Sequence, residues 1–176
     1  MFPKAHAAAY VMSALRLGWF KVHMPQVFYS AFLSVAPGGF DAEIVTKGKS
    51  NIVSVLREIE AKGKEATQKE TDMVATLQMC NEAYARGFEF LKPDLYKSHS
   101  FHFIPEGENG IRCPFSSMGG LGEAAAESIY NACKENTVLS VEDLRTRAQV
   151  SKAVIEILRK NGVLDSLSET NQMTMF

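Results

Sequence analysis

The apolar residues of this chain follow a helical spacing over most of its length, but between Ser98 and Phe115 they alternate with polar residues. Alternation of this kind is typical of β-strands. Residues 107–110, Gly-Glu-Asn-Gly, interrupt the alternation, and an Asn-Gly pair favours a tight hairpin turn. The sequence therefore predicts a mainly α fold that contains one small β-hairpin.

Helices are predicted before the hairpin. We expect two tightly packed helices to open the chain, one over residues 6–23 that is buried on most sides and one that begins after Pro25. Residues 40–62 predict one broken helix or two short ones, because Gly48 interrupts their apolar pattern. An amphipathic helix follows, and its apolar stripe is formed by Met73, Val74, Leu77, Cys80 and Tyr84.

Three more helices are predicted after the hairpin. They cover residues 119–136, which begin with glycines, residues 140–148 and residues 151–162. In the second of them Ser140 is the expected cap, with Asp143 at the third position.

The change of pattern near Pro93 predicts a domain boundary. We therefore expect one segment over residues 1–92, a second over 93–167 and a flexible tail over 168–176. The tail ends in Met and Phe residues although it has no helix or strand pattern, and a free terminus gains little from apolar side chains unless they dock on a partner.

Composition limits the classes of function. The hydrophobic fraction of 46% is enough for a buried core, and the formal net charge of −1 excludes a globally basic protein. A contact with nucleic acid would therefore need a local patch or backbone amides. The odd number of cysteines, Cys80, Cys113 and Cys133, favours free buried thiols in a reducing compartment. Residues 5–20 are too short and too charged to span a membrane, which predicts a cytoplasmic protein.

The stretch Gly120-Leu121-Gly122 could hold an anion. Two glycines one residue apart allow a tight turn, and the helix that follows offers unpaired N–H groups. A simple packing turn explains the pattern equally well, and Glu123 would repel a phosphate. Over residues 142–160 five cations outnumber three acids, and Ser151 begins another helix after a short turn. Two successive turns of this kind would grip two phosphates without reading bases, unless the cations only form a solvated face.

Lys4 and His6 lie at the start of an apolar helix. Cations at that end oppose the helix dipole, so their presence reflects either chance or an anionic ligand. His99 and His102 are three residues apart in the expected strand and should point to opposite faces, which argues against a shared metal. The sequence holds no residue pattern of a complete active site.

Several blocks, taken together and in this order, resemble the C-terminal end of the bacterial DNA polymerase III alpha subunit, PolC type. They are FPKAHAAAYVMSALRLGWFKVHMPQVFYSAFLSV, DLYKSHSFHFI, GIRCPFSSMGGLGEAAAESI, NGVLDSL and the terminal QMTMF. The resemblance extends over essentially the whole chain.

The resemblance implies a role for each segment. Residues 1–92 would be the distal, helical fingers segment, in which Lys4 and His6 would bind the phosphates of a deoxynucleoside triphosphate. Residues 93–167 would be a duplex-binding module with tandem helix-hairpin-helix elements, and its DNA-binding residues would be Gly120, Leu121, Gly122, Ala124 and Lys152. The tail would bind the bacterial sliding clamp (the beta subunit) through Gln172, Met173, Thr174, Met175 and Phe176.

The resemblance also implies what the chain does not do alone. The carboxylates that hold two metal ions lie earlier in such polymerases, so this segment would contain no catalytic residue and bind no cofactor, and magnesium would act in the full-length enzyme. Its DNA partner would be a primer-template duplex, and no membrane is involved. Two alternatives stay open: a self-standing, non-catalytic DNA-binding or clamp-adaptor protein, and an unrelated helical interaction domain.

Overall fold

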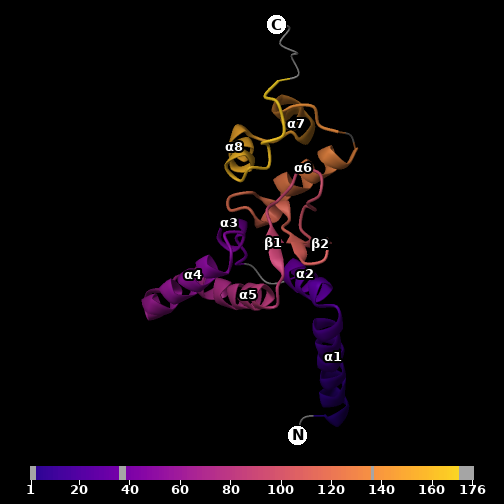
Figure 1. The fold of residues 1–176 in the computed structure, drawn as a ribbon, viewed down its shortest axis with the longest axis vertical. Helices are drawn as coiled ribbons and strands as arrows, with labels where there is room; N and C mark the ends of the chain where they lie inside the picture. Colours follow the sequence, from indigo (N-terminus) through magenta and orange to yellow (C-terminus); the bar gives the residue numbers. More distant parts are fainter. Residues whose placement is uncertain (1–2, 36–38, 136, 171–176) are drawn as a thin grey trace.

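The protein is described by a computed structural model that covers residues 3–35, 39–135 and 137–170. Its elements run in the order α1 Lys4–His23, α2 Pro25–Val35, α3 Ala42–Val45, α4 Lys49–Lys62, the 3-10 turn η1 Gly63–Glu65, α5 Gln68–Ala85, β1 Glu89–Leu91, β2 Ile104–Glu106, β3 Gly110–Arg112, the 3-10 turn η2 Phe115–Ser117, α6 Glu123–Glu135, α7 Val141–Ala148 and α8 Lys152–Lys160. The mainly α fold with a small β-hairpin is confirmed (Figure 1).

Side-chain caps fix where several helices begin. The Thr67 hydroxyl accepts the Glu70 N–H while the Glu70 carboxylate accepts the Thr67 N–H, a capping box that starts α5. The predicted Ser140 cap is confirmed, because its hydroxyl accepts the Asp143 N–H at 3.1 Å. Gly48, with φ of 100°, separates α3 from α4, so residues 40–62 form two helices rather than one.

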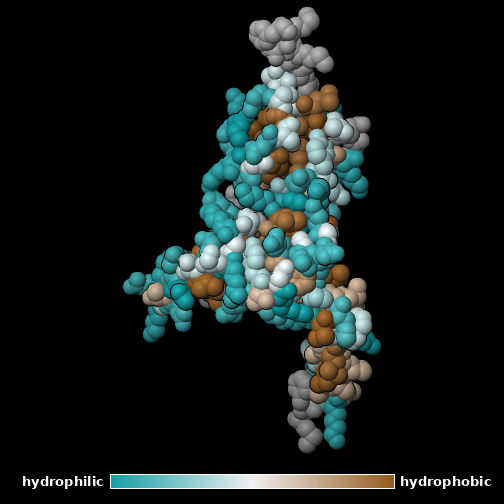
Figure 2. All heavy atoms as spheres, viewed as in Figure 1, coloured by the Kyte–Doolittle hydropathy of each residue, from teal (hydrophilic) through white to brown (hydrophobic). Residues whose placement is uncertain are grey.

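The prediction that the first helix is buried on most sides is wrong. None of the residues of α1, all of which lie within the described part of the chain, is buried, and Leu15 and Trp19 are 68% and 52% exposed. Nor are α1 and α2 packed along their length, since α1 projects away from the sheet (Figure 1) and carries hydrophobic residues on the face seen in Figure 2. The sequence correctly indicated that α1 is apolar, but no other element among the described residues covers its apolar side chains.

The end of α1 and the side of α2 enclose an apolar groove of about 640 Å³. It is lined by Leu17, Gly18, Phe20, Lys21, Val27, Phe28, Ala31, Phe32 and Val35. Lys21 is the charged residue of this lining, and its ammonium group donates to the Glu82 carboxylate of α5 at 2.8 Å.

The predicted hairpin is confirmed, in a shorter form. Strands β2 and β3 pair antiparallel with Ile104 opposite Arg112 and Glu106 opposite Gly110, around a turn at residues 107–109. Strand β1 was not predicted and pairs parallel with β3, giving the order β1-β3-β2. Gly110 is required at this crossing, because a Cβ there would lie 2.6 Å from the Glu106 carbonyl oxygen and 2.8 Å from Leu91 Cδ1.

Two clusters of buried side chains form the core. One gathers residues of α2 to α5 and the sheet, including Tyr29, Val45, Ile52, Leu77 and Ile111. The other gathers residues of η2 and α6 to α8, including Phe115, Met118, Ile129, Leu144 and Leu158. Phe103, Ile111 and Cys113 belong to the first cluster, so the hairpin packs with the N-terminal helices, while the domain division at residue 93 stays a prediction.

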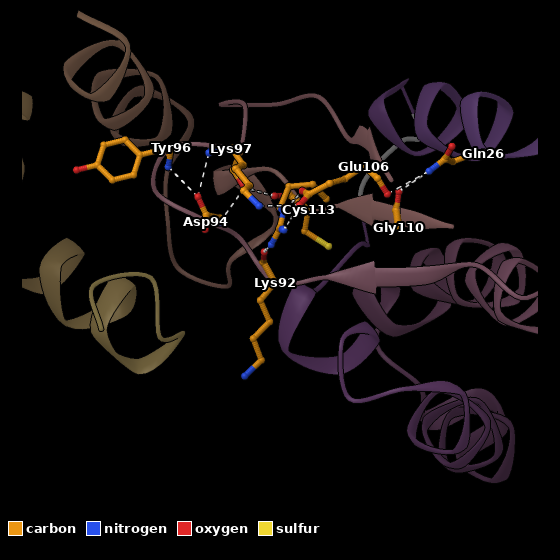
Figure 3. Close-up of polar contacts among 10 residues, drawn as sticks. Gln26, Lys92, Asp94, Tyr96, Lys97, Glu106, Gly110 and Cys113 are labelled. Carbon is orange, nitrogen blue, oxygen red and sulfur yellow. Dashed lines mark hydrogen bonds and ion pairs between the residues drawn. The ribbon is translucent and has the colours of Figure 1, made fainter. Parts of the chain in front are cut away.

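Glu106 ties the hairpin to the linking segment that precedes it. Its carboxylate accepts hydrogen bonds from Arg112 Nε at 2.7 Å and from Lys97 Nζ at 2.9 Å, as drawn in Figure 3. The hydrogen bond from Arg112 has the larger effect and that from Lys97 the smaller, and together they lower the pKa of Glu106 to about 2. Gln26 of α2 joins from the other side and donates to the Gly110 carbonyl at 2.8 Å (Figure 3).

The segment that follows β1 connects the two cores. The Asp94 carboxylate accepts the N–H groups of Tyr96 and Lys97 at 2.9 and 3.0 Å, which closes a turn (Figure 3). The Tyr96 hydroxyl then donates to the Val138 carbonyl at 3.0 Å, in the loop before α7. These contacts fix the C-terminal helices against the sheet.

The three cysteines are free thiols, as predicted. Cys80 and Cys113 are fully buried and Cys133 is half-buried. Burial raises the pKa of Cys80 to about 12 and that of Cys133 to about 11, and it also raises the pKa of Cys113. In the described ranges, no helix combines the length and the apolar character needed to cross a membrane.

Candidate nucleic-acid interface

The first hairpin of the candidate interface lies between η2 and α6. Gly120 has a φ of 85°, and a Cβ there would lie 3.3 Å from Ile157 Cδ1, so both the turn and the contact with α8 favour glycine. Leu121 is only 7% exposed, and its N–H donates to the Met118 carbonyl at 3.1 Å. Leu121 therefore anchors the hairpin in the core rather than lying on the surface.

The start of α6 presents free backbone donors. Its first bond joins the Ala126 N–H to the Gly122 carbonyl at 3.0 Å, so the N–H groups of the residues between them precede the intrahelical pattern. Gly122 and Ala124 are exposed, and a Cβ on Gly122 would meet no atom within 4 Å. An anion can approach these amides without a steric barrier.

A second hairpin joins α7 to α8 and repeats the first. Gln149 has a φ of 52° and is, among the described residues, the non-glycine residue with positive φ. Val150 is buried, Ser151 caps α8 by accepting the Val154 N–H at 3.3 Å, and Lys152 is the first helical residue. The sequence predicted a second turn of this kind before Ser151, but it did not indicate the positive φ of Gln149, where the first hairpin has glycine.

The two hairpins share one pattern: a residue with positive φ, a buried apolar residue, an exposed small residue and the first residue of a helix. The pattern covers residues 120–123 in the first and 149–152 in the second. Their charges differ, because Glu123 occupies the helix start where the second hairpin has Lys152. The second hairpin is thus the better site for a phosphate.

The surroundings of the two hairpins also differ. Beside the first hairpin, a Cβ on Gly119 would lie 3.5 Å from Asp41 Oδ2. Beside the second, Lys152 lines a cavity of about 350 Å³ together with Arg145 and Arg159. The same cavity also contains Glu142, Glu156 and Glu169, so its cations are partly neutralised.

Lys4 and His6 lie far from both hairpins, at the N-terminal end of α1 (Figure 1). Lys4 is the first residue of the helix, and both side chains are exposed. The His6 ring lies edge-on to Tyr10 with 4.6 Å between ring centroids. The first turn of α1 contains no acid, so the position agrees with the predicted helix start, and its ligand stays a prediction.

The placement of His99 and His102 in a strand was wrong. They lie in the loop before β2, and their ring centroids are 4.6 Å apart. His99 Nδ1 accepts the Phe101 N–H at 3.1 Å, which folds the loop back on itself. Burial, then the neighbouring His102 and Lys134, lower the pKa of His99. Within the described residues, no group of three His, Cys, Asp or Glu side chains could hold a metal ion.

The predicted clamp-binding residues, 172–176, lie outside the described residues. The last described residues, 168–170, lie against α7, where Ser168 forms a parallel bridge with Ser140.

One family of known proteins matches the part of the chain that contains both hairpins. The family described as the helix-hairpin-helix motif matches residues 87–174, half of this 176-residue chain. This chain belongs to the helix-hairpin-helix family. The matched range contains the turns at residues 120–123 and 149–152 and leaves α1 to α5 outside.

The whole chain is similar to one kind of replicative polymerase. It is 43% identical over 176 residues to the DNA polymerase III PolC-type of Caldanaerobacter subterraneus subsp. tengcongensis, and 43% identical to that of Bacillus subtilis. It is 46% identical over 177 residues to the corresponding protein of Thermotoga petrophila. Each match covers 100% of this chain, which spans only 12 to 13% of the length of these relatives. The resemblance to the PolC type is confirmed.

Proposed function

We propose that this chain is the part of a PolC-type DNA polymerase that grips the backbone of the product duplex and tethers the enzyme to the sliding clamp. The observation that carries the proposal is the repeat of one hairpin geometry at residues 120–123 and 149–152 in a chain of the helix-hairpin-helix family. Two such turns present helix amides to two phosphates and reach no base edge.

The hairpins contribute unequally to the proposed duplex contact. In the first, the exposed amides near Gly122 and Ala124 bind the backbone, and Leu121 and Gly120 hold the turn in shape. Glu123 weakens this contact, because its carboxylate repels a phosphate. In the second, Lys152 adds a positive charge to the helix start, so we expect it to supply the larger share of the salt-dependent affinity.

The N-terminal helices form the end of the fingers in this proposal. The region from Lys4 to Val35 contains no Asp or Glu, and its exposed apolar side chains are those of a helix buried in a larger protein. Other parts of the polymerase cover α1 and bring Lys4 and His6 to the phosphates of an incoming deoxynucleoside triphosphate. The chain alone then binds DNA but does not polymerise it.

The tail supplies the clamp contact in this proposal. Met173, Met175 and Phe176 are apolar anchors for a pocket on the clamp. The tail resembles the Gln-Leu-Ser/Asp-Leu-Phe peptide by which bacterial polymerases bind the clamp, and its methionines stand in place of the two leucines, with similar volume and more flexible side chains. Magnesium would act in the full-length polymerase, as the resemblance implies. The enzyme is cytoplasmic in this account.

The proposal is tested by duplex binding of the chain itself. We expect similar affinities for duplexes of unrelated sequence, and a steep loss of affinity as salt rises from 50 to 200 mM. Affinity that follows the base sequence, or that does not change with salt, contradicts backbone recognition. Nucleotide transfer by the chain alone contradicts its assignment as a non-catalytic segment of the polymerase.

A further inference from the structure

The segment that leads into the tail is bonded to α7. The Val141 N–H donates to the Ser168 carbonyl at 2.9 Å, and the Glu142 N–H donates to the Glu169 carbonyl at 3.2 Å. The first N–H groups of a helix have no partner within it, so these two carbonyls satisfy donors that α7 cannot. Residues 168–170 are therefore part of the folded module, and we call them the tail root.

Side chains hold the tail root from two more directions. Arg159 of α8 donates to both carboxylate oxygens of Glu169 at 2.9 Å. The Ser168 hydroxyl donates to the Leu139 carbonyl at 3.4 Å. One exposed ion pair contributes little by itself. Together with the backbone bonds, these contacts fix where the last residues of the chain start.

Leu139 lies beside the tail root as an exposed apolar side chain. It is 63% exposed, yet its backbone is held on both sides, since its N–H donates to Asp143 Oδ2 at 3.0 Å. The preceding residue, Val138, is buried and accepts the Tyr96 hydroxyl. The loop thus holds the Leu139 side chain in solvent, where it adds no buried apolar area to the core.

The predicted clamp-binding residues follow the tail root almost directly in the sequence. Gln172 is the second residue after Thr170, and an extended chain advances at most about 3.6 Å per residue, so little chain separates the two. A protein that seats residues 172–176 in a pocket must therefore approach the tail root and its neighbours.

We propose that the sliding clamp makes a second contact with this module, on a root surface formed by Leu139, Glu142, Arg159 and Glu169. The inference rests on the proposed clamp function of the tail. Leu139 supplies the apolar contact, and Glu142, Arg159 and Glu169, which line the cavity beside the tail root, supply polar contacts. Arg159 and Glu169 line the same cavity as Lys152 of the second hairpin, so duplex and clamp are held by neighbouring parts of one rigid module.

The test compares the whole chain with a synthetic peptide of residues 168–176 for binding to a bacterial sliding clamp. We expect the chain to bind about tenfold more tightly than the peptide, because burial of one leucine is enough for that difference. Leu139→Ser should remove most of the advantage. Leu15→Ser, a matched change at a 68% exposed leucine of α1, should not alter it.

A second variant makes the result independent of Leu139. Six Gly and Ser residues inserted after Thr170 should lower the affinity of the chain to that of the peptide, because the pocket and the root surface can then be occupied less readily together. Equal binding by chain and peptide, or full affinity in Leu139→Ser and in the insertion variant, overturns the second contact and leaves the clamp peptide standing. Failure of both chain and peptide to bind overturns the clamp function and this inference together.

Discussion

Gly120 and Ile157 meet where the first hairpin crosses α8: a Cβ on the glycine would lie 3.3 Å from Ile157 Cδ1. The contact joins the two helix-hairpin-helix elements into one unit, since Ile157 belongs to the helix that the second hairpin begins. The two turns that we propose to bind the DNA backbone are therefore held at a fixed separation. That fixed separation is what a regularly spaced phosphate backbone requires.

Gly120→Ala should destabilise the chain, and Gly122→Ala should not. At Gly120 the added Cβ is strained by the φ of 85° and presses on Ile157, whereas at Gly122 it meets no atom within 4 Å. We expect a loss of about 1 to 3 kcal/mol for the first variant and less than about 0.5 kcal/mol for the second. Urea unfolding of both measures the difference, and equal losses contradict the hairpin geometry.

Substitutions of Gln149 test the second hairpin. Its φ of 52° strains any residue with a branched Cβ, while glycine takes this conformation without cost. Gln149→Val should lower the free energy of unfolding by about 1 to 2 kcal/mol. Gln149→Gly should stay within about 0.5 kcal/mol of the original chain, because relief of strain offsets the added freedom of the unfolded state. A valine variant as stable as the glycine variant contradicts the left-handed turn.

Glu106 gives the chain a pH-dependent contribution to stability. Its pKa lies at about 2 in the folded protein against an ordinary 4.5, so the stabilisation is present above pH 4.5 and is lost as pH falls toward 2. Glu106→Gln should therefore be less stable than the original chain at pH 7 and equally stable near pH 2. Urea unfolding across this range measures it, with Glu108→Gln in the neighbouring turn as the control. A difference that does not change with pH rules out the ion pairs as its cause.

The three thiols should react in a defined order. Cys80 and Cys113 are fully buried and have raised pKa values, so at pH 8 they hold almost no thiolate and offer no access. Cys133 is half-buried and should be alkylated first. Mass spectrometry after iodoacetamide treatment measures the order in which the three thiols are alkylated. Labelling of Cys80 as fast as that of Cys133 in the folded protein contradicts the placement of α5 in the core.

Lys152→Gln should weaken duplex binding and lower its dependence on salt. Loss of one phosphate contact lowers the slope of log affinity against log salt by about one, at every sequence. Lys64→Gln, an exposed lysine of η1 outside the helix-hairpin-helix range, should leave the slope unchanged. Equal slopes for the original chain and Lys152→Gln remove the second hairpin from the proposed contact.

The sequence predicts local structure well and long-range placement poorly. The turn at residues 107–110 and the Ser140 cap could be read directly, because Asn-Gly and Ser-x-x-Asp act over a few residues. Strand β1 is only three residues long and depends on a partner some twenty residues away, which no local pattern reveals. The burial of α1 was mispredicted for a related reason: apolar composition says that a helix needs a cover, not that the described chain provides one.

Part of the candidate site could be predicted from the sequence. Gly120 and Gly122 mark the first hairpin, because glycine at a tight turn before a helix is a recognisable pattern. The left-handed conformation of Gln149 in the second hairpin could not be predicted, since a residue with a side chain gives no sign of positive φ. The second turn was expected only from Ser151, which can cap a helix, and from the cations around it, and its detailed match to the first hairpin needed the structure.

Gly122→Leu tests backbone recognition most directly. The position is open, so the leucine leaves the fold intact but keeps a phosphate away from the first amides of α6. We predict a loss of about tenfold or more in duplex affinity, the same for all sequences, from charge-assisted hydrogen bonds that no longer form. Asn131→Leu, which adds similar bulk to an exposed position further along α6, should bind as the original chain does. Full affinity in Gly122→Leu, or a loss confined to some sequences, would contradict the account.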